Sequence, residues 1–190
     1  MNIRKVFPTP IGYFNNKTFT DKVLTIVNGF INELQPSQWG YKSSYNDAKI
    51  SRRIVSNQFI MDYVDVVATK FVNEIGFQLP KPYKVDFFVS KILKDEWHDS
   101  HVHPNSMLSG VFYLKADKNV APLYLKDPRS ARLFNGFTHK DVTKKDTSRN
   151  IESFQPKSGD RIIFESWVPH VIPPSKIESE RITLVYNIFK

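Results

Sequence analysis

The 190-residue chain contains no cysteine, which excludes disulfide bonds, thiolate metal ligands and a cysteine nucleophile. It also contains no apolar run that approaches the ~18 residues needed to span a bilayer. The opening segment, MNIRKVFPTPIGYF, lacks the continuous apolar stretch of a secretory signal. We therefore expect a cytoplasmic protein without a membrane partner, in which any metal ion is held by histidine or carboxylate side chains.

Acidic residues are the minority, since 27 Lys and Arg against 19 Asp and Glu give a formal net charge of +8. Such an excess of positive charge suits an acidic partner or nucleic acid. The basic residues are scattered, however, and their densest group, 139–149, is predicted to be a solvated loop. Ordinary surface charge is thus favoured over a nucleic-acid site, and a homo-oligomer is left open.

Apolar and aromatic side chains are abundant, with 41% hydrophobic residues, fifteen Phe and eight Tyr. This composition favours a folded globule with a sizeable core over a disordered chain. No internal repeat or linker divides the sequence. We expect one domain over residues 1–190, in which a mostly helical segment, 1–80, supports a β-rich core, 81–190.

Two segments of the first eighty residues have helical periodicity. In residues 20–35 apolar side chains recur on one face of a helix, which Pro36 is expected to end. Residues 57–76 repeat the pattern, and Gly76 suits a C-cap. The polar residues 37–53 between these helices are predicted to form a long loop.

The pattern changes after Pro80, where short β-type runs alternate with turn residues. Many short strands at regular spacing are typical of an antiparallel sandwich or barrel. The expected class is therefore α+β, mainly β, with the helices packed on a β-core. The five predicted strands are residues 83–93, 107–116, 122–127, 160–166 and 180–189.

Three of the five histidines lie beside these strands, in the segments SHVHP and WVPH. Because alternate residues of a strand share a face, His101 and His103 are predicted to point together. His170, which follows the fourth run, is the best candidate for a third ligand. Neutral imidazole is a common metal ligand, and three such groups leave coordination positions open for chemistry.

The order of these segments resembles the iron(II)- and 2-oxoglutarate-dependent dioxygenases, and among them the prolyl-hydroxylase-like members. Two motifs carry the resemblance: SHVHPNSMLSGVFYL, with His103 where most members have a carboxylate, and SGDRIIFESWVPH, with Arg181 eleven residues after His170. The segments VFPTPIG and DPR, together with HxHP and SWxxH, are similar to a narrower group found in marine bacteria and tailed phages.

The resemblance implies a double-stranded β-helix, the cupin-like jelly roll, over residues 81–190. It implies an enzyme that uses Fe(II) and 2-oxoglutarate to hydroxylate a small-molecule or peptide or protein substrate, releasing succinate and carbon dioxide. For a phage-encoded protein the location would be the host cytoplasm.

The resemblance also assigns the metal ligands. His101 and His170 would be the first and the distal iron ligands, and His103 the second ligand in place of the usual carboxylate. Asp99 is the alternative second ligand, because it lies two residues before His101 and so shares its strand face. If Asp99 is not a ligand, we expect it beside the ligands.

The cosubstrate contacts follow from the same resemblance. Arg181 would bind the distal carboxylate of 2-oxoglutarate through a bidentate, charge-assisted pair. By strand parity Thr183 shares the face of Arg181 and could bind the same carboxylate. Further candidates to donate a hydroxyl to 2-oxoglutarate are Tyr113, Tyr124 and Ser109.

Three more residues are expected around the site. Trp167 and Phe164 are predicted to pack against it, and Arg129 either lines the entrance or pairs with Asp127 at the surface. His98 is expected to be a surface residue or a neighbour of the ligands.

Two other classes of function stay open on the sequence alone. One is a three-histidine cupin metalloenzyme that does not use 2-oxoglutarate. The other is a non-enzymatic β-sandwich protein with a structural or binding role, whose histidines are incidental. The direction of Arg181 separates the first class from a 2-oxoglutarate enzyme, and metal content separates the second.

Overall fold

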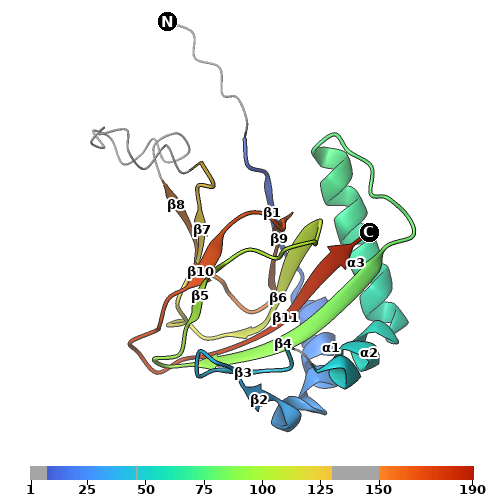
Figure 1. The fold of residues 1–190 in the computed structure, drawn as a ribbon. Helices are drawn as coiled ribbons and strands as arrows, with labels where there is room; N and C mark the ends of the chain where they lie inside the picture. Colours follow the sequence, from blue (N-terminus) through green and yellow to red (C-terminus); the bar gives the residue numbers. More distant parts are fainter. Residues whose placement is uncertain (1–7, 46, 130–149) are drawn as a thin grey trace, which may run out of the picture.

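The computed structural model describes residues 8–45, 47–129 and 150–190, so the basic segment 139–149 with its histidine lies outside the described residues. Its strands form two antiparallel sheets (Figure 1). The larger sheet has the strand order β1 (Ile11–Asn15), β9 (Asp160–Glu165), β6 (Leu108–Ala116), β11 (Glu180–Phe189), β4 (Lys84–Leu93), β3 (Lys42–Ser43) and β2 (Gln35–Pro36).

The smaller sheet lies opposite the larger one and carries the histidine segments. Its strand order is β5 (His98–His101), β10 (His170–Ile172), β7 (Leu123–Lys126) and β8 (Ile151–Phe154). The two sheets enclose a second, smaller apolar cluster, which includes Tyr113, Leu123 and Phe164. This arrangement confirms the predicted mainly-β jelly roll with helices on one side.

The helices α1 (Lys17–Asn28), α2 (Ala48–Val55) and α3 (Gln58–Glu74) cover the outer face of the larger sheet (Figure 1). Each helix begins at a residue whose side chain accepts hydrogen bonds from the first free backbone amides: Asn16, Asp47 and Asn57. The apolar faces of the helices pack on alternate residues of β6 and β11, which forms the main core.

The predicted helix boundaries need correction. The first helix covers Lys17–Asn28 rather than 20–35, because the Asn16 side chain caps it earlier; a 3-10 turn, η1 (Ile31–Glu33), follows it. The second prediction agrees with α3, and Gly76 has the positive φ of 85° expected just beyond a helix end. The loop predicted over 37–53 is wrong, since it contains β3 and the start of α2.

The predicted strands all exist, including the four-residue β7, but several other short strands were missed. Runs of three to five residues, such as β1, β5, β8 and β10, are too short or too polar to show an alternating pattern. Two of them carry the site, because β5 reads HDSH and β10 reads HVI. A polar strand such as β5 forms because it pairs with a neighbouring strand, and its own hydrophobicity contributes little.

Gly110 in β6 is required by close packing in the main core. A Cβ built at this position would overlap the ring of Tyr186 on the neighbouring strand, with which Gly110 is paired. The Tyr186 side chain is 1% exposed and lies under the helices. The glycine of the SGVFYL motif therefore serves the fold rather than the cavity on the other face.

Candidate metal centre

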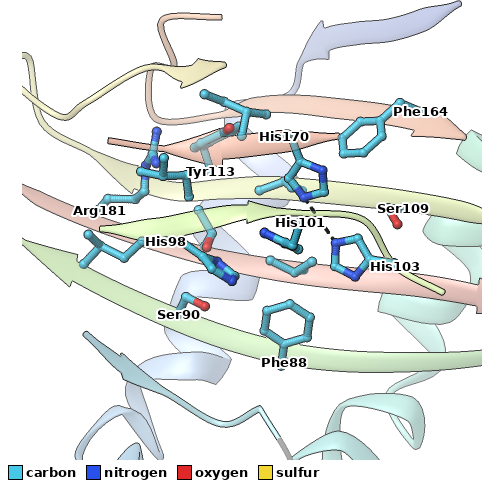
Figure 2. Close-up of a pocket in the computed structure, with 16 residues that line it drawn as sticks. Phe88, Ser90, His98, His101, His103, Ser109, Tyr113, Phe164, His170 and Arg181 are labelled. Carbon is cyan, nitrogen blue, oxygen red and sulfur yellow. Dashed lines mark hydrogen bonds between the residues drawn. The ribbon is translucent and has the colours of Figure 1, made fainter. Parts of the chain in front are cut away.

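A cavity between the two sheets contains all three histidines that the sequence singled out. Its empty space, including the part that is open to solvent, is about 490 Å³. Sixteen residues from both sheets line it, and Figure 2 shows Arg181 at one end with the histidines toward the other. Its walls are mostly apolar, with a few polar groups that converge on the same space.

His101 and His170 come from neighbouring strands, since they are direct partners in the register of β5 and β10. In each ring Nδ1 faces a backbone carbonyl: the distance is 2.6 Å to Asp99 O and 3.0 Å to Val168 O. A carbonyl only accepts, so each Nδ1 carries the proton and each Nε2 keeps a free lone pair. Both rings could therefore bind a metal ion through Nε2.

His103 reaches the same point by a different route than predicted. The strand β5 ends at His101, so strand parity does not orient His103. Its backbone is held instead by a hydrogen bond that the His103 amide donates to Ser166 O at 3.0 Å, just before a turn at 104–105. Its Nε2 lies 3.2 Å from Nε2 of His170, the contact drawn as a dashed line in Figure 2.

The ligand atoms of His101, His103 and His170 all lie within 4.8 Å of one another, a group that could hold a metal ion. Nitrogens at right angles around an ion, each ~2.1 Å from it, would be ~3 Å apart, so the observed 3.2 Å suits cis ligands. Asp99 does not join the group: its carboxylate is exposed, and only its backbone oxygen contacts His101.

Burial keeps these imidazoles neutral, the form that binds a metal. It lowers the pKa of His103 to about 4 and that of His170 to about 3, and it also lowers the pKa of His101. The neighbouring histidines lower the pKa values of His103 and His170 further, because the rings would repel one another if protonated. The group is therefore ready for a cation at neutral pH without losing protons.

A chain of buried hydroxyls holds the two histidine loops together. Ser166 Oγ lies 2.8 Å from Ser106 Oγ and 2.7 Å from Ser109 Oγ, and Ser109 donates to Asn187 Oδ1 at 2.8 Å. The Ser166 amide also donates to Met107 O. Ser109 lines the cavity as predicted, but its proton is used within the protein, which argues against its predicted contact with 2-oxoglutarate. Sequence reasoning missed Ser166.

Arg181 is a buried cation at the far end of the cavity. It is 2% exposed, its Nη2 donates to Ala121 O at 2.6 Å, and its buried Nε has no hydrogen-bond partner. Among the described residues no carboxylate forms an ion pair with it; the adjacent Glu180 is paired with Lys91 and Lys115. An uncompensated buried guanidinium is costly, so an anionic group in this cavity would satisfy it.

Two other predicted contacts share the Arg181 end. Thr183 lines the cavity, as strand parity predicted, and is 4% exposed. The buried ring of Tyr113 lies 5.3 Å from the Arg181 guanidinium, and its hydroxyl makes no hydrogen bond to any described residue. Burial raises the pKa of Tyr113 to about 12, so the phenol is a donor at neutral pH.

Four predictions around the site have different outcomes. Phe164 lines the cavity, with its ring edge-on to His170 at 5.0 Å. Tyr124 does not, because its strand neighbours Leu123 and Leu125 face inward and turn it to the opposite side. Trp167 is 46% exposed rather than packed on the site. Arg129 makes a bidentate surface pair with Asp127, at 2.7 and 2.8 Å, and does not line the cavity.

His98 belongs to the cavity more closely than predicted. Its ring stacks on His101 with centroids 4.0 Å apart, and its Nδ1 lies 3.2 Å from the hydroxyl of the buried Tyr41. Burial lowers the pKa of His98 to about 3. A histidine three residues before another, in the strand HDSH, was the available signal, but it could not reveal Tyr41 from a distant hairpin.

Three imidazoles thus converge in the cavity of an antiparallel jelly roll and form a group that could hold a metal ion. Solved structures share this fold. A prolyl-4-hydroxylase from Pseudomonas putida matches with a TM-score of 0.59 and 13% identity over 96% of this chain and 93% of that one. A prolyl hydroxylase from Trichoplax adhaerens, in complex with a hypoxia inducible factor peptide fragment, matches with a TM-score of 0.59 and 12% identity over 94% and 83%.

A third structure, HygX from Streptomyces hygroscopicus with nickel, 2-oxoglutarate and hygromycin B bound, gives a TM-score of 0.59 at 8% identity over 95% and 83% of the two chains. The family model described as "Putative 2OG-Fe(II) oxygenase" matches residues 87–187, more than half of the sequence. The chain therefore belongs to the 2OG-Fe(II) oxygenase family. No curated protein matches the sequence.

This membership confirms the predicted enzyme class and the predicted cofactors, Fe(II) and 2-oxoglutarate. The residues of the cavity fit both: three neutral imidazoles form a group that could hold a metal ion, and no carboxylate in the described ranges pairs with the buried guanidinium of Arg181. The family also decides between the classes of function that the sequence left open, in favour of the 2-oxoglutarate-dependent oxygenase.

Proposed function

We propose that His101, His103 and His170 hold the iron of this oxygenase and that Arg181 binds the distal carboxylate of 2-oxoglutarate, for hydroxylation of a substrate that enters the same cavity. The observation that carries the proposal is the buried Arg181, whose Nε is unpaired in a cavity that also contains the three converging Nε2 atoms.

The charge balance supports this assignment. Three neutral imidazoles leave the full 2+ charge of the iron uncompensated, whereas the usual carboxylate would remove part of it. A dianionic 2-oxoglutarate between the iron and Arg181 would offset two of their three positive charges in a low-dielectric cavity. We therefore expect cosubstrate and metal to bind cooperatively, each much weaker without the other.

When bound, the iron and 2-oxoglutarate supply the oxidation by dioxygen, with release of succinate and carbon dioxide. The protein positions the bound groups and shields them from bulk water. His101 and His170 are oriented through their Nδ1 protons, and Thr183 and Tyr113 offer hydroxyls near Arg181. Apolar walls, including Phe88 and Phe164, keep bulk water from the site.

The substrate is proposed to be a small molecule or a peptide or protein segment. Prolyl hydroxylases with this fold support the peptide class, and HygX, crystallised with hygromycin B, supports the small-molecule class. Among the described residues no helix is long and apolar enough to cross a membrane. A cytoplasmic location, in a bacterium or a phage-infected host, is proposed from the motif resemblance alone.

Anaerobic titration tests the proposal. Protein mixed with Fe(II) and then 2-oxoglutarate should develop the weak visible charge-transfer band of the chelate. Arg181→Ala should weaken 2-oxoglutarate binding strongly, whereas Fe(II) binding measured without 2-oxoglutarate should be no weaker than in the wild type. The surface residue Arg129 is the matched control, so Arg129→Ala should bind like the wild type. An absent band in the wild type, or equal affinity in both variants, would overturn the proposal.

A further inference from the structure

The cavity contains a fourth histidine, His98, which is not part of the group of three that could hold a metal ion. Its ring stacks on that of His101 with centroids 4.0 Å apart, and the ring of Trp39 lies 4.5 Å from it. Figure 2 shows His98 beside Ser90, which also lines the cavity. The packing of its ring therefore holds His98 in place next to the proposed ligands.

Tyr41, in the β2–β3 hairpin, sets the tautomer of His98. Its buried hydroxyl lies 3.2 Å from His98 Nδ1 and also has hydrogen bonds with the side chains of Ser37 and Ser90. Burial raises the pKa of Tyr41 and lowers that of His98, so both groups are neutral at pH 7. A phenol donates more strongly than a serine hydroxyl, and the imidazole nitrogen is the best acceptor among these neighbours. We therefore expect Tyr41 to donate to Nδ1, which leaves the proton of the imidazole on Nε2.

The Nε2–H of His98 is then a free hydrogen-bond donor in the cavity. Among the described residues nothing accepts from it, since the hydrogen bond of this ring is at Nδ1. His101 and His170 have the opposite tautomer, because their Nδ1 atoms donate to backbone carbonyls and their Nε2 atoms keep a lone pair. Those two rings can bind a cation, whereas His98 can bind an acceptor oxygen.

The charge of the cavity favours an acceptor that is an anion. None of the sixteen described residues that line it is Asp, Glu or Lys. With iron and cosubstrate bound, Fe(II) and Arg181 would carry three positive charges and 2-oxoglutarate two negative charges. The remaining positive charge would repel an ammonium group and attract a carboxylate in this low-dielectric space. The formal net charge of +8 would also draw an acidic substrate toward the protein.

We propose that His98 is a specificity-determining residue whose Nε2–H binds a carboxylate of the substrate, so that the enzyme acts on acidic substrates. The proposal rests on the proposed function, which places iron and 2-oxoglutarate in the same cavity. Arg181 and Thr183 would hold the cosubstrate, and His98 would orient the substrate relative to the iron. Tyr41 is a positioning residue, because it acts only through the tautomer of His98.

Nitrogen-15 NMR of the histidine side chains tests the tautomer. The full chain is loaded with Zn(II) and 2-oxoglutarate, because Zn(II) is diamagnetic and accepts imidazole ligands. We expect the His98 proton on Nε2 in the wild type. Tyr41→Phe should give a mixture of the two tautomers, whereas Tyr45→Phe, at an exposed tyrosine, should resemble the wild type. A His98 proton on Nδ1 in the wild-type protein would overturn the proposal.

Three fragments of matched shape test the preference for an anion. Cyclohexanecarboxylate, cyclohexanecarboxamide and cyclohexylmethylamine are each titrated into the anaerobic complex with Fe(II) and 2-oxoglutarate, and the shift of the charge-transfer band is measured. The carboxylate should bind at least about tenfold more tightly than the amine. Equal or tighter binding of the amine, or no shift with any fragment, would overturn the proposal and leave the proposed function standing. So would loss of the band through displacement of 2-oxoglutarate.

Two variants of His98 assign the preference to this residue. His98→Phe keeps a ring but removes the donor, so it should bind cyclohexanecarboxylate about tenfold more weakly with an unchanged Kd for 2-oxoglutarate. His98→Gln provides an amide N–H in place of Nε2–H and should retain most of the affinity. A change confined to the 2-oxoglutarate Kd would make His98 a cosubstrate residue and overturn the proposal. If the wild type forms no charge-transfer band before any fragment is added, the proposed function fails as well.

Discussion

The two faces of β11 are equally buried but differ in what they contain. On the helix side Ile182, Leu184, Tyr186 and Ile188 belong to the apolar core. On the cavity side Arg181, Thr183 and Val185 line the proposed site, and Asn187 accepts from Ser109. Every one of these side chains is 9% exposed or less. Burial alone therefore does not separate core from site; on this strand the difference is that the cavity face carries polar side chains, among them Arg181 with its unpaired Nε.

The largest effect is expected from a substitution in the cavity, which should remove Fe(II) binding. His103→Ala removes one of three proposed ligands and should abolish measurable Fe(II) binding, because two imidazoles alone hold iron weakly. Equilibrium binding of Fe(II) under nitrogen measures it. Asp99→Ala is the control and should bind like the wild type, since its carboxylate is exposed. The reverse pattern would make Asp99 the second ligand.

The next largest effect is expected from a substitution on the helix side of β11, which should lower stability without changing metal binding. Leu184→Ala should lower the free energy of unfolding by about 3 kcal/mol, because the Leu184 side chain is completely buried and leaves a cavity. Urea unfolding of the metal-free protein measures the loss. Leu184→Met, which preserves volume, should cost less than about 1.5 kcal/mol. Fe(II) affinity of folded Leu184→Ala should be unchanged; a parallel loss of iron would show that the two faces are coupled.

Lowering the pH should act through the cavity and not through the apolar core, because the cavity contains histidines that can be protonated. The pKa of His103 is lowered to about 4, and those of His98 and His170 to about 3, from 6.5 in the unfolded chain. Between these values the unfolded state binds more protons, so the metal-free protein should lose stability as the pH falls from about 6.5 toward 4. Urea unfolding at several pH values measures the slope.

His98→Phe is the matched variant for the dependence of stability on pH. It removes one titrating group but keeps a ring in the cavity. Its stability should fall less steeply over the same range. Equal stability of the wild-type protein at pH values near 7 and near 5 would contradict burial of neutral histidines.

The smallest effect concerns a single hydroxyl beside Arg181. Thr183→Val preserves shape but removes a proposed hydrogen bond to 2-oxoglutarate, worth about 1 kcal/mol, or roughly fivefold in Kd. Thr183→Ser should retain the affinity. Titration of the charge-transfer band measures both variants, and an unchanged Kd in Thr183→Val would remove Thr183 from the cosubstrate site.

Much of this architecture could be predicted from the sequence. The long strands were visible because β6, β9 and β11 alternate between two buried faces, and the same alternation placed Arg181 and Thr183 together. The histidine group followed from spacing and resemblance. Short polar strands were missed, because four residues such as HDSH have no hydrophobic period and fold only against their neighbours.

The errors around the site have a common physical cause. Tyr124 and Trp167 are near the histidines in sequence or strand order, but side-chain direction depends on register and turns that sequence does not specify. His103 lies beyond the end of β5, and a hydrogen bond from its amide to Ser166 O holds its backbone there. Contacts between distant segments, such as Tyr41 with His98, have no local pattern at all.

The pairing of His101 with His170 has a consequence for folding. These residues join β5 and β10, strands of four and three residues that pair with a shift in register and together offer little hydrophobic surface. A metal ion bound by both residues would cross-link the two strands. Its binding free energy would add to the stability of the smaller sheet. The smaller sheet, which carries His101 and His170, would therefore reach its full stability only when the metal ion is bound.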